Sequence, residues 1–410
     1  MKTWVKRGLW IGAGLAALGA AVVSSGLVSL SARAGHWEVT EQLLAFAKDR
    51  SVATHSLGVE PPVALDDPAL ILRGAGHYEG GCRWCHGAPG RPQPAVGQAM
   101  LPPPTDLPPF ARDEPPAQLY RVIHDGIKFT GMPGWPAKDR GDEVWALVAF
   151  VKALPGMSAD DYDRLVWSGE PAPAGVPAVV AVACARCHGF DGMGRMAGAF
   201  PRLAGQREPY LVGALEAYAS GARPSGVMGP IAVALRGDDL RAAARYYAGL
   251  DGLARKVRGF PSRATGDRLA GGSAEGEPAQ AYPEVRRAWR GRAEPHGRRD
   301  RGAQQGTRAL FGLGAAAEAS AAGGRIVREG VPDDKIPACH GCHGPTAHDR
   351  NPAYPLLAGQ DARYLREQLV LFRERRRGGS QYAELMQAVR AHGLDDAQIA
   401  AVSVWYGAAE

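Results

Sequence analysis

Six cysteines, arranged in three pairs, are the most reactive side chains of this sequence. Two residues separate the cysteines of each pair, histidine and glycine follow, and the three CxxCH units use every cysteine of the 410 residues. A haem carries two vinyl groups, and two thiols on such a tight turn can form a thioether bond to each while the adjacent histidine lies beneath the iron. The spacing therefore predicts three covalently bound haem c groups. The predicted attachment residues are Cys82, Cys85, Cys184, Cys187, Cys339 and Cys342, and the predicted proximal iron ligands are His86, His188 and His343.

Two other uses of paired cysteines fit this spacing less well. A zinc ribbon needs a second pair about 15 to 20 residues from the first, whereas the first cysteines of successive pairs are 102 and 155 residues apart. A redox dithiol belongs at the end of a strand in a βαβ unit. No such unit surrounds any of the pairs, and haem attachment is favoured over zinc, a dithiol or a structural disulfide.

The sixth iron ligand decides whether the haem transfers electrons or binds a small molecule, because Met/His coordination closes the site and raises the reduction potential. A methionine lies 40 to 46 residues after each CxxCH histidine. In the third unit Met386 is the sole candidate. In the second unit Met193 and Met196 lie too close to their histidine to reach the opposite haem face, which leaves Met228.

The first unit offers Met100, Met132 and Met157. Met132 is preferred because Gly131 and Pro133 would keep its loop extended and close to the haem. The predicted distal ligands are therefore Met132, Met228 and Met386, with His124 and His392 as histidine alternatives in the first and third units.

A backbone carbonyl usually accepts a hydrogen bond from the second ring nitrogen of a metal-bound histidine, which fixes the orientation of the ring. Pro201 and Pro355 follow their histidines by 13 and 12 residues and are the predicted acceptors in the second and third units. Pro102 is the nearest counterpart in the first unit.

An amphipathic helix is expected to close each unit, with Asp142, Asp238 or Asp395 as its N-cap. No convincing run of alternating strand residues occurs anywhere, so the predicted fold class is all-α, with helices around a buried cofactor. The apolar positions at helical spacing are Val144, Leu147, Val148 and Val151; Leu240, Ala243, Ala244 and Tyr247; and Ile399, Val402, Ser403 and Tyr406, where the serine interrupts the apolar series.

The N-terminal stretch of residues 8–30 has no charged residue and as a helix would be about 35 Å long, enough to cross a bilayer core of about 30 Å. Lys2, Lys6 and Arg7 precede it and leave the N-terminus in the cytoplasm. This pattern predicts a single-pass protein of the inner (cytoplasmic) membrane with its haem domains in the periplasm. A cleaved signal peptide is the alternative, because the residues 32–34 resemble a cleavage site.

The formal net charge of +6 comes from one segment, residues 253–318, which holds 13 Lys and Arg against 7 Asp and Glu. The remaining chain is formally neutral, so nucleic acid is not a predicted partner. The segment lacks sustained periodicity and is interpreted as a flexible linker. The predicted divisions are a membrane anchor or signal peptide (1–34), a juxtamembrane segment with an interfacial helix (35–66), the first unit (67–156), the second unit (157–252), the basic linker (253–318) and the third unit (319–410).

The second and third units share an internal repeat. PRLAGQ at residues 201–206 matches PLLAGQ at 355–360, and a Tyr-Leu pair follows each at the same offset. With their CxxCH and methionine segments, these units resemble the dihaem cytochrome c4 group, and all three units resemble class I cytochromes c. The resemblance covers 67–252 and 319–410 and implies three cytochrome c domains in tandem, periplasmic, with His/Met haems. Two features differ from it: no clear amphipathic helix directly precedes Cys184, unless residues 159–167 serve as one, and the basic linker separates the paired units.

These features predict a membrane-tethered electron carrier rather than an enzyme. Its expected partners are redox proteins: a quinol-oxidising complex or a periplasmic dehydrogenase as donor, and a terminal oxidase or reductase as acceptor. Such encounters are usually small and transient. The alternative is a permanently bound cytochrome subunit of a dehydrogenase or terminal oxidase complex. A haem peroxidase or gas sensor would need an open iron position, which the three methionines disfavour.

Overall fold

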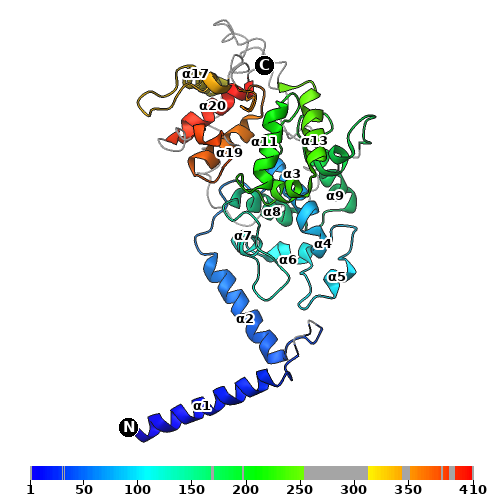
Figure 1. Cartoon of the computed structure of the whole chain (residues 1–410), viewed down its shortest axis with the longest axis vertical. Helices are drawn as coiled ribbons and strands as arrows, with labels where there is room; N and C mark the ends of the chain where they lie inside the picture. Colours follow the sequence, from blue (N-terminus) through cyan, green and yellow to red (C-terminus); the bar gives the residue numbers. More distant parts are fainter. Residues whose placement is uncertain are drawn as a thin grey trace.

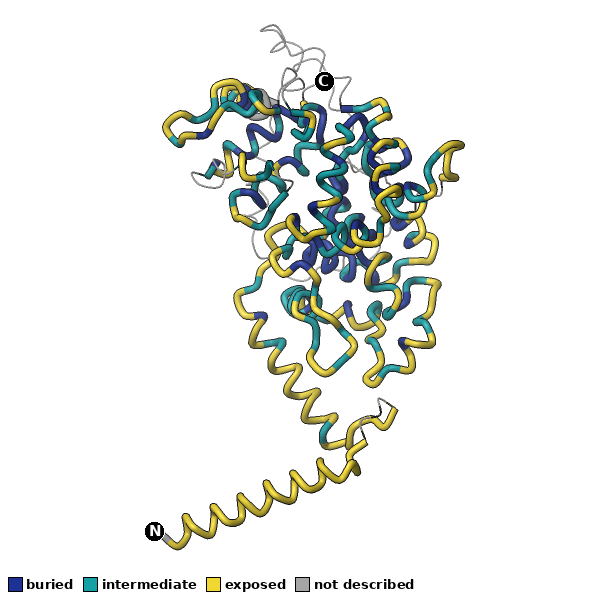
Figure 2. Tube along the Cα trace, viewed as in Figure 1, coloured by how far each residue is buried: buried dark blue, intermediate teal, exposed yellow. Residues whose placement is uncertain are grey.

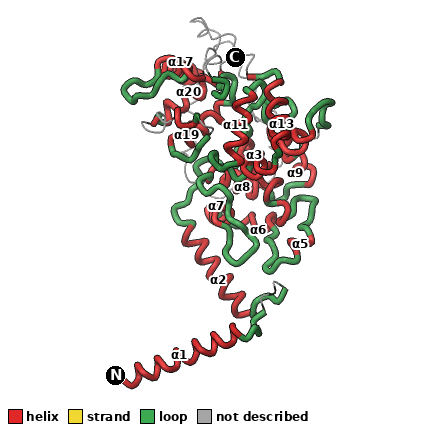
Figure 3. Tube along the Cα trace, viewed as in Figure 1, coloured by secondary structure: helices red, strands yellow, loops and turns green. Residues whose placement is uncertain are grey.

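The computed structural model describes residues 2–29, 31, 33–167, 170–195, 198–253, 313–343, 351–379, 382–386 and 393–408. Helices joined by loops make up these residues, and no strand is assigned among them (Figure 3). The predicted all-α class is confirmed. Most of the predicted basic linker lies outside the described residues, as do Met196 and His392.

Helix α1 (Lys2–Ser24) projects away from the rest of the molecule and is exposed along its described length (Figures 1 and 2). Among the described helices it alone is long and apolar enough to cross a membrane, a test that a signal sequence near the N-terminus also passes. The helix ends before the predicted limit of residue 30. Ser25 turns its hydroxyl back to the carbonyl of Val22, and Gly26 has a φ of +73°, which stops the helix.

Helix α2 (Glu38–His55) connects α1 with the three units and confirms that the segment 35–66 contains a helix (Figure 1). Nearly all of its residues are exposed, and none is buried. Its C-terminal end is fixed to the first unit, because Arg121 Nε donates to the carbonyl of His55 at 2.7 Å.

The first unit is built on a crossing of two helices, α3 (Pro68–Gly81) and α8 (Gly141–Ala153). Gly74 allows the close approach, because a Cβ at this position would lie 1.9 Å from the carbonyl oxygen of Ala146. Its other helices are α4 (Arg83–His86), α5 (Ala95–Gln98), α6 (Leu107–Asp113), α7 (Pro116–Asp125) and α9 (Ala159–Val166).

Helix α9 was predicted to belong to the second unit, but it packs on the first. Tyr162, Leu165 and Val166 lie in the same buried cluster as the α3 and α8 side chains, and the ring of Tyr162 meets that of Tyr78 edge-on at 6.4 Å. The core of the first unit therefore extends past the predicted boundary at residue 156.

The third unit repeats the crossing with α17 (Leu313–Glu329) and α20 (Asp396–Ala408). Helix α17 begins inside the segment predicted as linker. The second unit has only the short π-helical turn Val180–Cys184 directly before its first CxxCH cysteine, in agreement with the missing amphipathic pattern there. The remaining elements are α10 (Ala185–His188), α11 (Glu208–Ala219), α12 (Met228–Ala234) and α13 (Gly237–Gly249) in the second unit, and α18 (His340–His343), α19 (Ala362–Arg373) and the 3-10 turn Ala383–Met386 in the third.

The closing helices α8, α13 and α20 bury every apolar position predicted for them, together with Ser403. Of the three N-cap residues predicted for these helices, one is correct. Asp395 and Gln398 form a reciprocal capping box, with Asp395 Oδ1 accepting from Gln398 N at 2.7 Å. Asp142 and Asp238 instead lie inside the first turns of α8 and α13, because those helices begin at Gly141 and Gly237, two residues earlier than predicted, with arginines at their N-cap positions.

Candidate functional site

Each CxxCH segment forms a one-turn helix that starts directly after its first cysteine and ends at its histidine, in α4, α10 and α18. In the first turn His86 N donates to Cys82 O at 3.0 Å, and in the third His343 N donates to Cys339 O at 2.9 Å. None of the six cysteines forms a disulfide. The chain thus adopts, at all three places, the tight turn that brings two thiols and an imidazole together.

The three histidines share one hydrogen-bonding pattern. The Nδ1 atoms of His188 and His343 lie 3.1 Å from the carbonyl oxygens of Pro201 and Pro355, as predicted. In the first unit the acceptor is Thr105, at 2.9 Å from the Nδ1 of His86, and the prediction of Pro102 is wrong. The first loop is longer, since its acceptor follows the histidine by 19 residues rather than 13 or 12. This bond leaves Nε2 of each ring as the nitrogen that can bind iron.

Burial suits these side chains to a metal site. Burial lowers the pKa values of His188 and His343, which favours the neutral imidazole that a metal requires. Burial also raises the pKa of Cys184 to about 12 and that of Cys339 to about 11. The sulfur atoms therefore lie in surroundings that disfavour a thiolate and accommodate an uncharged thioether.

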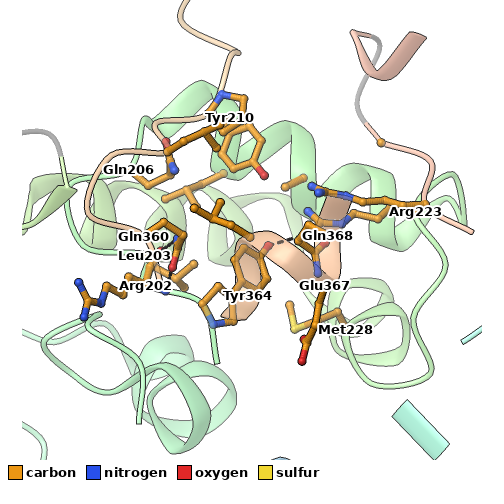
Figure 4. A pocket seen from close by; sticks show the side chains of 18 of the residues that line it. Arg202, Leu203, Gln206, Tyr210, Arg223, Met228, Gln360, Tyr364, Glu367 and Gln368 are labelled. Carbon is orange, nitrogen blue, oxygen red and sulfur yellow. Dashed lines mark hydrogen bonds between the residues drawn. The ribbon is translucent and has the colours of Figure 1, made fainter. Parts of the chain in front are cut away.

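One cavity of about 370 Å³ lies between the second and third units (Figure 4). It reaches both CxxCH turns and both predicted methionines of these units. The structure therefore brings together the predicted residues Cys184, Cys187, His188 and Met228 with Cys339, Cys342, His343 and Met386 along one continuous cavity.

Two arginines, the buried Arg223 and the half-buried Arg377, occupy equivalent places in the repeat, 154 residues apart, and both line this cavity. Each stacks on the aromatic ring five residues before it: Arg223 lies 4.5 Å from the Tyr218 centroid and Arg377 lies 4.4 Å from the Phe372 centroid. Burial and the neighbouring charge of Arg223 lower the pKa of Arg377. The two cations therefore interact across the unit boundary.

Neither guanidinium forms an ion pair with a carboxylate among the described residues. Arg223 Nη2 donates to Tyr364 Oη and Gln368 Oε1, each at 3.2 Å, and Figure 4 shows these side chains close together. The buried Nε of Arg377 has no hydrogen-bond partner. Buried charge without a counter-ion is costly, so the cavity calls for an anionic group. The carboxylates of a haem meet that requirement, and the residues present fit the group.

Two glutamines join the walls of the cavity. Gln206 Nε2 donates to Leu356 O at 3.1 Å, and Gln206 Oε1 accepts from Leu356 N at 2.9 Å. Gln360 makes the same pair of bonds to the backbone of Arg202, both at 2.9 Å. The PxLAGQ repeat was recognised in the sequence as a duplication, but its role as a two-fold contact between units was missed, and so were the two arginines.

In the first unit the predicted ligand loop is held by its backbone. Met132 is half-buried, and its carbonyl accepts from Ile127 N at 3.0 Å. The Met100 side chain packs directly against Gly131 of this loop. Both ring nitrogens of His124 are engaged, Nδ1 with Asp125 at 2.5 Å and Nε2 with the carbonyl of Lys138 at 2.9 Å, which disfavours this alternative ligand.

Comparisons with known proteins place these features in a family. Residues 69–151 match the family model of cytochrome c oxidase, cbb3-type, subunit III. The chain is 32% identical over 244 residues to the thiosulfate dehydrogenase electron acceptor of Thiomonas intermedia, covering 60% of this chain and 86% of that protein. It is 30% identical over 224 residues to cytochrome c4 of Pseudomonas aeruginosa, covering 54% and 82%.

Among solved structures, reduced cytochrome c4 from Pseudomonas stutzeri is similar, with 26% identity, a TM-score of 0.36 and coverage of 56% of this chain and 95% of that chain. The CxxCH turns, their oriented histidines and the identity to relatives aligned over most of their length lead to one conclusion. The chain belongs to the c-type cytochromes, whose cofactor is haem c.

Proposed function

We propose that this chain is a trihaem electron carrier, anchored by α1 in the cytoplasmic membrane with its three haem units in the periplasm. One haem c is attached at each CxxCH turn, with His86 and Met132, His188 and Met228, and His343 and Met386 as axial ligand pairs. The observation that carries the proposal is the repeated Nδ1-to-carbonyl bond of the three histidines.

The haem, when bound, supplies an iron that alternates between ferrous and ferric states. The protein residues control that change. The backbone carbonyls orient the imidazoles, and the mostly apolar cavity would keep water from a bound haem iron. Arg223 and Arg377 would compensate the haem carboxylates and favour the reduced state through their positive charge.

The electron donor that we propose is a periplasmic dehydrogenase, and the acceptor is a terminal oxidase or reductase. The relatives named thiosulfate dehydrogenase electron acceptor, from Thiomonas intermedia and Stutzerimonas stutzeri, support this choice, since this chain covers 86% and 92% of their lengths. Thiosulfate dehydrogenase is therefore the donor to test first.

The test is direct reduction. The oxidised, haem-loaded chain is mixed with thiosulfate and a thiosulfate dehydrogenase, and the haem absorption is followed in time. We expect reduction of all three haems only when enzyme and thiosulfate are both present. A chain that stays oxidised with the active enzyme would contradict thiosulfate dehydrogenase as donor.

The alternative is that the chain is a permanently bound cytochrome subunit of a dehydrogenase or terminal oxidase complex. The two possibilities differ in the stability of the complex. Purification from membranes in a mild detergent separates them: a catalytic subunit recovered in equal amounts favours a permanent complex, and the cytochrome alone favours a carrier. Membrane fractions of the chain with and without residues 1–34 test the anchor.

A further inference from the structure

A buried carboxylate, Glu143 of α8, lies where the first and second units meet. It is 4% exposed. Its Oε1 accepts from the hydroxyl of Ser225 at 2.6 Å, and its Oε2 accepts from Gly226 N at 2.7 Å and from the indole nitrogen of Trp135 at 3.0 Å. Burying a carboxylate is costly unless donors surround it, and here the donors come from both units.

These donors belong to the two methionine loops. Trp135 follows Met132 by three residues, and Ser225 precedes Met228 by three. The Ser225 hydroxyl, which donates to Glu143, also accepts from the backbone nitrogen of Met228 at 3.0 Å. A continuous chain of hydrogen bonds thus runs from the carboxylate to the backbone of a predicted iron ligand.

The loops also touch directly. A Cβ on Gly226 would lie 2.3 Å from Cε2 of Trp135, so the backbone of one loop packs against the indole of the other. Only glycine permits this approach. The contact places an aromatic ring of the first unit against the segment that carries Met228.

An arginine fixes the same junction from its other side. Arg140 Nη1 lies 3.0 Å from Glu143 Oε1 and donates to the carbonyl of Pro224 at 2.8 Å. Asp142 holds the guanidinium with two bonds, at 2.8 and 2.9 Å. The junction is therefore hydrogen-bonded on each side and resists displacement of either loop.

We propose that Glu143 is a positioning residue shared by the first and second haems, and that it makes the Trp135–Gly226 contact the passage for electrons between them. This inference rests on the proposed function, because both methionines must bind iron. One electron leaves the ferrous iron of one unit and reduces the ferric iron of the other, without any bond forming or breaking. Since transfer slows steeply with distance, fixing the loops keeps this step fast.

The test compares the haem-loaded full chain with four variants at the junction and one control variant. Redox titration gives the three potentials, assigned by replacing each methionine in turn, and a laser-triggered reduction gives the transfer rate between the first two haems. Glu143→Leu is expected to shift the first and second potentials, to leave the third unchanged and to slow transfer about tenfold. Glu143→Gln keeps one acceptor oxygen and should give smaller changes of the same kind.

Variants of the two side-chain donors to Glu143 distinguish an effect on the first haem from an effect on the second. Ser225→Ala should shift the second potential alone, and Trp135→Phe, which keeps the ring but removes the N–H donor, should shift the first alone. These mild variants carry the test should Glu143→Leu fail to fold.

Asp67→Asn is the matched control. It weakens the ion pair with Arg363 of the third unit, 2.5 Å long, while the new amide can still cap α3. We expect it to change neither the first two potentials nor the transfer rate. Unchanged potentials in every Glu143, Ser225 and Trp135 variant, or equal shifts of all three haems, would overturn this inference alone. A parent protein without methionine-bound iron in the first two units would overturn the proposed ligands as well.

Discussion

Gln206 and Gln360, 154 residues apart, each form two hydrogen bonds to the backbone of the PxLAGQ segment that contains the other glutamine. Gln206 binds the backbone of Leu356 at 3.1 and 2.9 Å, and Gln360 binds the backbone of Arg202 through two bonds of 2.9 Å. Both side chains are buried. An internal duplication has thus produced a two-fold contact within one chain, as in a symmetric dimer.

This contact predicts a specific loss of stability. Gln206→Ala leaves the buried N–H and carbonyl of Leu356 without their partner, and Gln360→Ala removes the same two bonds from the half-buried backbone of Arg202. Each is expected to lower the free energy of unfolding by about 1 to 3 kcal/mol. Urea unfolding measures the change. Gln98→Ala is the control, because that amide bonds Gln93 at the exposed surface; equal losses in all three variants would contradict the role of the pair.

The methionine ligands predict a spectroscopic result. Met132→Leu, Met228→Leu and Met386→Leu conserve side-chain volume but remove the sulfur. Each should abolish the sulfur-to-iron absorption band of one ferric haem and lower the potential of that haem.

Met100→Leu provides the sharpest control for the first unit, because its side chain packs against Gly131 of the Met132 loop. The band should survive in this variant. If the band disappears in Met100→Leu and survives in Met132→Leu, the ligand is Met100 instead of Met132.

The paired arginines predict lower potentials when charge is removed. A nearby positive charge favours ferrous haem, so Arg223→Gln or Arg377→Gln should lower the potential of the adjacent haem by roughly 70 mV, the effect of one charge about 10 Å away at an effective dielectric constant near 20. Redox titration measures the shift. Arg223→Lys keeps the charge and should shift the potential less; a raised potential in the glutamine variants would refute the assignment.

His77 predicts an acid-dependent stability. Burial, with a contribution from the charge of Arg73, lowers the pKa of His77 from 6.5 to about 3. Below pH 6.5, His77 therefore binds a proton in the unfolded chain but stays neutral in the folded chain. The stability due to neutral His77 is complete above pH 6.5 and is lost as the pH falls toward 3.

The matching experiment compares unfolding free energies across that pH range. His77→Gln should reduce the loss of unfolding free energy between pH 6.5 and pH 3 by about 2 to 4 kcal/mol relative to the parent. His36→Gln, a change at an exposed position, is the control and should lose as much unfolding free energy over this pH range as the parent does. An equal loss of unfolding free energy in the parent and in His77→Gln would show that the His77 ring does not cause the acid destabilisation.

Short-range patterns in the sequence predicted much of the fold. The CxxCH turns, the buried faces of α8, α13 and α20, and the carbonyls of Pro201 and Pro355 all depend on residues close together in the chain. The first-unit acceptor was misplaced because loop length, which pattern alone does not set, decides which carbonyl reaches His86.

Contacts between units could not be predicted in this way. Glu143 occupies an ordinary acidic position near the start of a helix, and only the folded chain brings it to Ser225, 82 residues away. Arg223 and Arg377 are two of many arginines in the sequence. The one available signal was their equal offset in the repeat, which also relates Gln206 to Gln360.

We propose that three haems are covalently attached, at Cys82 and Cys85, Cys184 and Cys187, and Cys339 and Cys342. Intact mass measurement after acid extraction tests it most directly, on the parent and on variants with one cysteine pair changed to alanine. We predict a polypeptide carrying three haem masses, and two in each variant. Pigment released into the extract, or a polypeptide without added haem mass, would show that the haems are not covalently attached.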